Sequence, residues 1–185
     1  MNDVLTRYPA IGLHGVAIAE LGGGEMSRMI RDTHADESPV TWIVLSLVAA
    51  CNPDVLAGRV QAAIRSADLV HGSDVRPVYS TIVRELGRAF DAAGAFRART
   101  LAQKALIAAY LCIQGADRHE YRLGRVVGGY RRWRAQLPGC EGDNGRFDPG
   151  SAVAEAFTDV VLHGNDASEQ AKILHRVLID AAPRT

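Results

Sequence analysis

The stretch VTWIVLSLVAAC (residues 40–51) is the longest apolar run of the chain, and only a threonine and a serine interrupt it. At about 12 residues it is too short to span a bilayer, which needs roughly 20. The preceding pair Ser38-Pro39 is typical of a helix start, because serine caps free N–H groups and proline suits the first helical position. We therefore interpret residues 39–51 as a buried core helix.

Outward from this run, apolar residues recur at helical spacing along most of the chain. Val78, Ile82, Leu86 and Phe90 form one such stripe. We expect helices near residues 9–20, 24–34, 39–51, 53–70, 76–93, 96–114, 118–136, 150–163 and 166–182. No convincing alternation of a strand is present. The predicted fold class is all-α: a single compact bundle of about seven to nine helices around the buried helix at 39–51.

Length and composition indicate one domain. The 185 residues are enough to bury a core, and 48% hydrophobic with 23% charged residues is ordinary globular composition. The segment near 138–150 is rich in Gly, Pro, Asp and Asn, so we expect a flexible loop there. The prediction is a single α-helical domain over residues 1–185.

The three cysteines, Cys51, Cys112 and Cys140, lie far apart and form no CxxC pair. This spacing argues against a disulfide framework or a zinc site and favours a reducing compartment, which we take to be the cytoplasm. An acidic residue, a proline and a histidine interrupt the N-terminal apolar stretch, so no signal peptide is expected, although export without a cleavable leader stays open. Nineteen arginines against two lysines indicate a GC-rich genome, which favours a bacterium or its phage as the source.

The formal net charge of zero conceals an uneven distribution. Residues 76–134 carry twelve Arg or Lys and four Asp or Glu, a net charge of +8, whereas residues 1–75 and 135–185 each carry −4. Such asymmetry indicates an anionic partner, or acidic ends that fold onto a basic middle.

Residues 118–136 form the most basic predicted helix. Four arginines from Arg118 to Arg132 are spaced 4, 3 and 7 residues apart, which at about 100° per residue places them within an arc of roughly 80°. Guanidinium groups suit bidentate contacts with carboxylate or phosphate. The candidate binding residues are Arg118, Arg122, Arg125, Arg131, Arg132, Arg134, Arg84 and Arg88. A solvated face, or pairing with the chain's own carboxylates, is the alternative explanation.

Candidate catalytic residues are few. His119 beside Arg122 and Arg125 resembles an acid–base group near an anion site, but Asp117 and Glu120 have the spacing of a capping box, which accounts for both carboxylates. No HExxH pattern occurs, and the glycine run at 22–24 has no predicted strand before it and no GKS or GKT after it. The sequence therefore predicts no metal and no cofactor.

These patterns favour a non-catalytic binding protein, such as an adaptor, regulator or effector-type interaction module. Its arginine-rich helical face would contact an acidic protein or another polyanion. Two alternatives remain: a regulator that binds nucleic acid through the same arginines, and an enzyme that acts on an anionic small molecule with His119 near Arg122 and Arg125. Self-association of basic and acidic regions is a further interpretation.

Overall fold

The computed structural model describes residues 2–32, 40–114, 123–142 and 145–183. In chain order its elements are α1 (Asn2–Arg7), β1 (Leu13–Ala19), η1 (Gly22–Gly24), β2 (Ser27–Asp32), β3 (Val40–Ser46), α2 (Leu47–Cys51), α3 (Pro53–Arg65), α4 (Pro77–Ala93), α5 (Arg97–Ile113), α6 (Leu123–Arg134), α7 (Pro149–His163), η2 (Gly164–Asp166) and α8 (Glu169–Ala181). The fold is therefore a mixture of helices and a small sheet, and the prediction of an all-α bundle is wrong.

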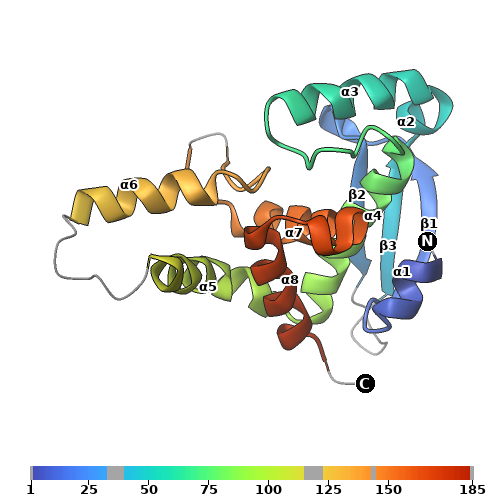
Figure 1. Ribbon diagram of the computed structural model, residues 1–185. Helices are drawn as coiled ribbons and strands as arrows, with labels where there is room; N and C mark the ends of the chain where they lie inside the picture. The colour runs from blue at the N-terminus through green and yellow to red at the C-terminus, as the bar shows by residue number, and fades with distance from the viewer. Residues whose placement is uncertain (1, 33–39, 115–122, 143–144, 184–185) are drawn as a thin grey trace.

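The sheet has three strands in the order β1-β3-β2. Strand β1 is parallel to β3, and β2 is antiparallel to it. Two of the strands replace helices that were predicted near 9–20 and 24–34. The sheet stands at one end of the molecule, and α4 crosses it toward the remaining helices (Figure 1).

The deciding stretch at 40–51 divides into two elements. Its first half, rich in β-branched and aromatic residues, is the central strand β3, in which Ile43, Val44 and Leu45 are all buried. Because both faces of β3 are covered, its sequence shows a continuous apolar run that periodicity alone does not separate from a helix. Ser46 ends the strand and caps the short helix α2, since its Oγ accepts a hydrogen bond from Ala49 N at 3.0 Å.

A close side-chain contact explains why a glycine stands at position 15 in β1. Gly15 of β1 lies beside Trp42 of β3, and a Cβ at Gly15 would lie 2.7 Å from the Trp42 ring. The ring of His14 also packs against Trp42, with centroids 4.8 Å apart. Glycine at position 15 therefore makes room for the indole on the face of the sheet.

The centre of the helical part is α7 and not the segment 39–51. Every residue from Ala152 to Asp159 is buried, and α7 packs against α4, α5 and α8. Figure 1 shows α7 at the middle of the molecule, with α5 and α6 extending away from the sheet. The helices expected near 53–70, 76–93, 96–114, 118–136, 150–163 and 166–182 are confirmed as α3 to α8; within the described residues five of them are somewhat shorter than expected, and α7 begins one residue earlier.

Helices α2 and α3 pack over one end of the sheet through a small apolar cluster of their own. This cluster joins Leu45 and Ala49 to Leu56 and Val60 of α3. The larger core, formed mainly by α4, α5, α7 and α8, is a different cluster. A cleft lies between α3 and α4, in a space that neither apolar cluster fills.

The segment near 138–150 leads into α7. Asp148 caps that helix, and its side chain accepts hydrogen bonds from Gly150 N and Ser151 N. Glu141 and Phe147 form an isolated antiparallel bridge. Flexibility of this segment, and the single-domain organisation of the chain, stay predictions. Among the described residues no helix is long and apolar enough to cross a membrane.

Candidate functional site

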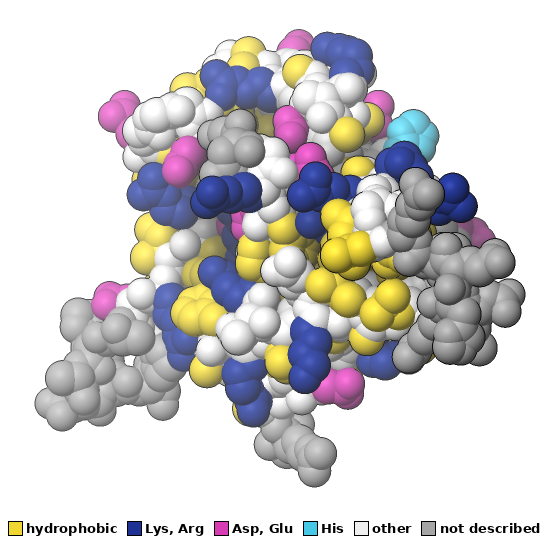
Figure 2. All heavy atoms as spheres, turned by 90° about the vertical axis from the view of Figure 1, so that its left-hand side faces the viewer, with side chains coloured by type: hydrophobic (Ala, Val, Ile, Leu, Met, Phe, Trp, Pro, Cys, Tyr) yellow, Lys and Arg dark blue, Asp and Glu magenta, His cyan; other side chains and the backbone are white. Residues whose placement is uncertain are grey.

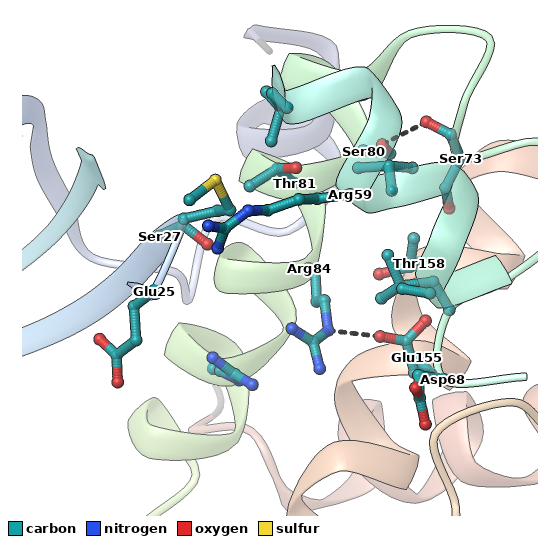
Figure 3. Close-up of a pocket in the computed structure, with 16 residues that line it drawn as sticks. Glu25, Ser27, Arg59, Asp68, Ser73, Ser80, Thr81, Arg84, Glu155 and Thr158 are labelled. Atoms are coloured by element: carbon teal, nitrogen blue, oxygen red, sulfur yellow. Dashed lines mark hydrogen bonds and ion pairs between the residues drawn. The ribbon is translucent and has the colours of Figure 1, made fainter. Parts of the chain in front are cut away.

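A cleft with a volume of about 340 Å³ lies between α3, α4, the start of β2 and α7 (Figure 3). The wall formed by α4 carries four polar side chains, which are Ser80, Thr81, Arg84 and Arg88. Apart from Arg59, the wall formed by α3 is apolar and includes Leu56, Val60 and Ala63. The cleft thus offers a polar and an apolar surface to the same volume.

Arg84 is held at the base of the cleft by a buried carboxylate. Its Nε donates a hydrogen bond to Glu155 Oε1, and Val70 N donates to Glu155 Oε2 at 3.1 Å. The Glu155 side chain on α7 is fully buried, and this burial raises its pKa although the guanidinium of Arg84 opposes the change. In Figure 3 the two other nitrogens of Arg84 point away from Glu155.

Arg88, one turn further along α4, is held by a second buried carboxylate. Its Nη1 donates to Glu85 Oε1 at 2.9 Å and to Oε2 at 3.2 Å. Ser27 of β2 donates its hydroxyl to Glu85 Oε1 at 2.8 Å. Because Glu85 is fully buried, these contacts fix both the carboxylate and the direction of Arg88.

Arg59 reaches the cleft from α3. It is exposed, and its Nη1 donates to the carbonyl oxygen of Gly24. It also lines a neighbouring cavity of about 250 Å³, which includes Leu47 and Val48 of α2. Arg59 therefore stands between the two cavities and connects α3 to the turn before β2.

The local sequence accounts for this arrangement on α4. Leu86 and Phe90 are buried in the core, whereas Arg84 and Arg88, four residues apart, share a different face of the helix. Ser80 lies one turn before Arg84, and its hydroxyl donates to Ser73 O at 2.7 Å. The helical repeat of three to four residues that buries one side of α4 therefore also aligns its polar side chains along the cleft.

The structure separates the predicted arginines into two groups. Arg84 and Arg88 line the cleft, whereas Arg125, Arg131 and Arg132 are exposed on α6, which extends from another part of the molecule (Figure 1). Figure 2 shows that Lys and Arg side chains on the face it views are spread among hydrophobic and acidic side chains.

Arg134 differs from the other arginines of α6 because it is buried. Its Nη2 donates to Glu141 Oε1 at 2.8 Å, and its guanidinium carbon lies 5.1 Å from the ring centroid of Phe147 and 5.7 Å from that of Tyr130. These contacts hold the segment after α6 against the helix. The side chain is therefore turned inward instead of adding to an exposed arginine face.

Three residues named from the sequence, Arg118, Arg122 and His119, lie outside the described residues. Their proposed roles stay predictions. Within the described part of the chain, no group of three or more His, Cys, Asp or Glu side chains is arranged to hold a metal ion.

Sequence reasoning missed several site residues, among them the charged residues Arg59, Glu85 and Glu155. A signal for Glu155 was present, because it interrupts the apolar sequence AVAEAF, where a buried charge requires a partner. Arg59 has no comparable signal, since it lies on an amphipathic helix where an exposed arginine is ordinary. Its role follows only from the packing of α3 over β2.

The described lining of the cleft offers mainly hydrogen-bonding and apolar groups. Its described lining contains serine and threonine hydroxyls but neither histidine nor cysteine, so no lining nucleophile is paired with an imidazole base there. Comparison of the chain with family models, curated proteins and solved structures gave no match. The chemistry of the described residues is therefore the basis for any functional conclusion.

Proposed function

We propose that the protein is a non-catalytic binding protein that takes up an anionic group of a partner in the cleft between α3 and α4. One observation carries this proposal: Arg59, Arg84 and Arg88 reach a single cleft from two different helices. Guanidinium groups converging on a partly enclosed volume favour an anion, because desolvation strengthens charge-assisted hydrogen bonds. An acidic protein is the partner that we propose first.

The two inner arginines are preorganised for this role. Each is hydrogen-bonded to a buried carboxylate, so its position is set before a ligand arrives and little side-chain entropy is lost on binding. The hydrogen bond of Arg59 is the easiest of the three to exchange for a ligand. Its partner in the protein is a neutral carbonyl oxygen, which an anion can replace.

The substitution Arg59→Gln tests the proposal, because it removes a guanidinium from the cleft without exposing a buried carboxylate. We expect about tenfold weaker binding of a glutamate-rich peptide, the loss typical of one charge-assisted hydrogen bond. The matched control is Arg65→Gln, which removes an exposed arginine from the same helix outside the cleft. Isothermal titration calorimetry at low salt measures both. Equal binding by the two variants and the unsubstituted protein contradicts the proposal.

A second candidate function, nucleic-acid binding, is favoured by one observation on α6. Arg125, Arg131 and Arg132 are exposed, and none forms an ion pair with another described residue. Binding through these groups predicts an affinity for double-stranded DNA that falls steeply as salt rises. Filter binding between 50 and 200 mM salt tests this, and absence of binding at the lower concentration dismisses it.

A further inference from the structure

The unused polar atoms of the cleft are mainly N–H donors. In hydrogen bonds to described residues, Arg84 uses only Nε and Arg88 uses only Nη1. Four guanidinium nitrogens on α4 therefore have no described hydrogen-bond partner: Nη1 and Nη2 of Arg84, and Nε and Nη2 of Arg88. The oxygens of Glu155 and Glu85 already accept hydrogen bonds. A ligand that satisfies this cleft must therefore supply acceptors, as an oxyanion does.

The surrounding carboxylates limit how much negative charge the ligand can carry. Glu155 and Glu85 lie directly behind the two arginines, and Glu25 and Asp68 also belong to the lining or rim of the cleft. A dianion placed against Arg84 would meet repulsion from these groups in a partly desolvated site. A singly charged group can accept the same hydrogen bonds, and its repulsion from these carboxylates is about half that of a dianion.

The free edge of Arg84 matches a planar oxyanion. With Nε occupied by Glu155, the remaining Nη1 and Nη2 atoms form a two-pronged donor edge that faces away from that carboxylate (Figure 3). Two parallel hydrogen bonds from such an edge fit the two oxygens of a carboxylate. Thr81 adds a hydroxyl to the same wall.

The opposite wall indicates what the carboxylate is attached to. Leu56, Val60 and Leu69 line the cleft across from the α4 arginines, together with the thioether of Met26. An apolar group that covers these side chains would be stabilised by removal of its surface from water. The cleft volume of about 340 Å³ is at the small end of ligand sites.

We infer that the cleft binds a carboxylate carried on a short apolar stem, which deepens the proposed function and rests on it. This chemistry has two sources: a glutamate side chain of an acidic partner, or a free small organic acid. In either case the carboxylate lies on the Nη edge of Arg84 within reach of Arg88 and Arg59, and the stem lies against Leu56 and Val60.

Calorimetry on the full chain with four probes tests this inference: 4-methylpentanoate, its uncharged amide, inorganic phosphate and a glutamate-rich peptide. We expect the acid or the peptide to bind, the amide to bind at least about tenfold more weakly than the acid, and phosphate to bind no more tightly than the acid. Tighter binding of the peptide identifies the protein source, and tighter binding of the free acid identifies the small molecule.

The two levels of the proposal fail in different ways. If phosphate binds more tightly than the acid and the peptide, the carboxylate inference is overturned while anion binding by the cleft stands. Binding of acid and amide with equal affinity also overturns it. If none of the anionic probes binds, the proposed function falls as well.

The substitution Arg84→Lys sharpens the test, because lysine keeps the charge beside Glu155 but lacks the two-pronged edge. We expect about tenfold weaker binding of 4-methylpentanoate, with Arg65→Lys as the unaffected control. Should Arg84→Lys not fold, Arg59→Gln gives the second measurement on a residue that contacts no buried carboxylate. Unchanged affinity in the folded variants overturns the inference.

Discussion

Two arginine-bearing helices of this protein use the same side chain in opposite ways. On α4, Arg84 and Arg88 each contact a fully buried glutamate and also line the cleft. On α6, Arg131 and Arg132 are exposed and have no ion pair with the described residues. Both pairs come from the segment with a net charge of +8, so the count of charges did not distinguish them.

The difference teaches that burial of the partner decides what an arginine contributes. An exposed guanidinium is hydrated and screened, and its removal changes little. A guanidinium beside a buried carboxylate compensates a charge that is removed from water, so deletion of the guanidinium has a large effect. The functional consequence follows the same division: Arg84 and Arg88 are fixed in direction before a ligand binds, whereas no described ion pair holds Arg131 or Arg132.

The largest expected effect comes from Arg84→Ala. This substitution leaves Glu155 buried without its guanidinium partner, and we expect the free energy of unfolding to fall by about 3–5 kcal/mol. Urea denaturation monitored by tryptophan fluorescence and far-ultraviolet circular dichroism measures it. The matched substitution on α6 is Arg131→Ala, for which we expect a change within about 0.5 kcal/mol. Similar losses of unfolding free energy for the two variants would contradict the proposed difference between the α4 and α6 arginines.

A smaller effect is expected from Ser27→Ala, which tests the second buried carboxylate. It removes the hydroxyl that donates to Glu85 Oε1 at 2.8 Å but leaves the contacts from Arg88 intact. We expect a loss of about 2 kcal/mol, as for a hydrogen bond to a charged group. The control is Ser66→Ala at an exposed serine, expected to lose less than about 1 kcal/mol in the same urea assay.

The raised pKa of Glu155 predicts a pH dependence. A carboxyl whose pKa is higher in the folded than in the unfolded state contributes stability below its ordinary pKa and loses that contribution as pH rises through the folded pKa. The guanidinium groups of Arg84 and Arg88 face this carboxyl and oppose the change. Relative to the unsubstituted protein, Glu155→Gln should therefore gain stability as pH rises from about 4 upward. A stability difference that is constant with pH would show that burial does not raise the pKa of Glu155.

The fold could be predicted from the sequence where local signals, such as apolar spacing or a capping residue before a proline, mark an element. Helix α8 shows a clear apolar stripe because solvent covers its other side, and α4 shows one because its polar side chains lie on a different face; both were located to within a few residues. Strand β3 is buried on both faces, so its apolar run carries no period. The edge strand β1 contains Gly15 and two alanines, which are weak strand formers. It pairs with β3, which is distant in sequence, so local sequence patterns do not predict the pairing.

The site was predictable to a similar degree. Spacing alone identified Arg84 and Arg88 as neighbours on one helix face, since that is a local property of α4. Their place in a binding cleft depends on residues that are distant in sequence. Glu155 of α7 fixes Arg84, and α3 brings Arg59 to the other wall of the cleft. Such contacts follow from tertiary packing and leave no trace in local periodicity.

The smallest expected effect on stability tests the independence of the two arginine regions. The triple substitution Arg125→Glu, Arg131→Glu and Arg132→Glu reverses exposed charges on α6, and we expect each site to change the free energy of unfolding by no more than about 0.5 kcal/mol. Retention on a heparin column at low salt should fall, because three cationic groups are replaced by anionic ones.

Binding of 4-methylpentanoate by the same variant separates the regions. Because α6 contributes no described residue to the cleft, the affinity should change by less than about twofold once salt screens long-range repulsion at 0.15 M. A large loss of affinity would mean that the α6 arginines and the cleft act on one ligand, and the two helices would then form one binding surface.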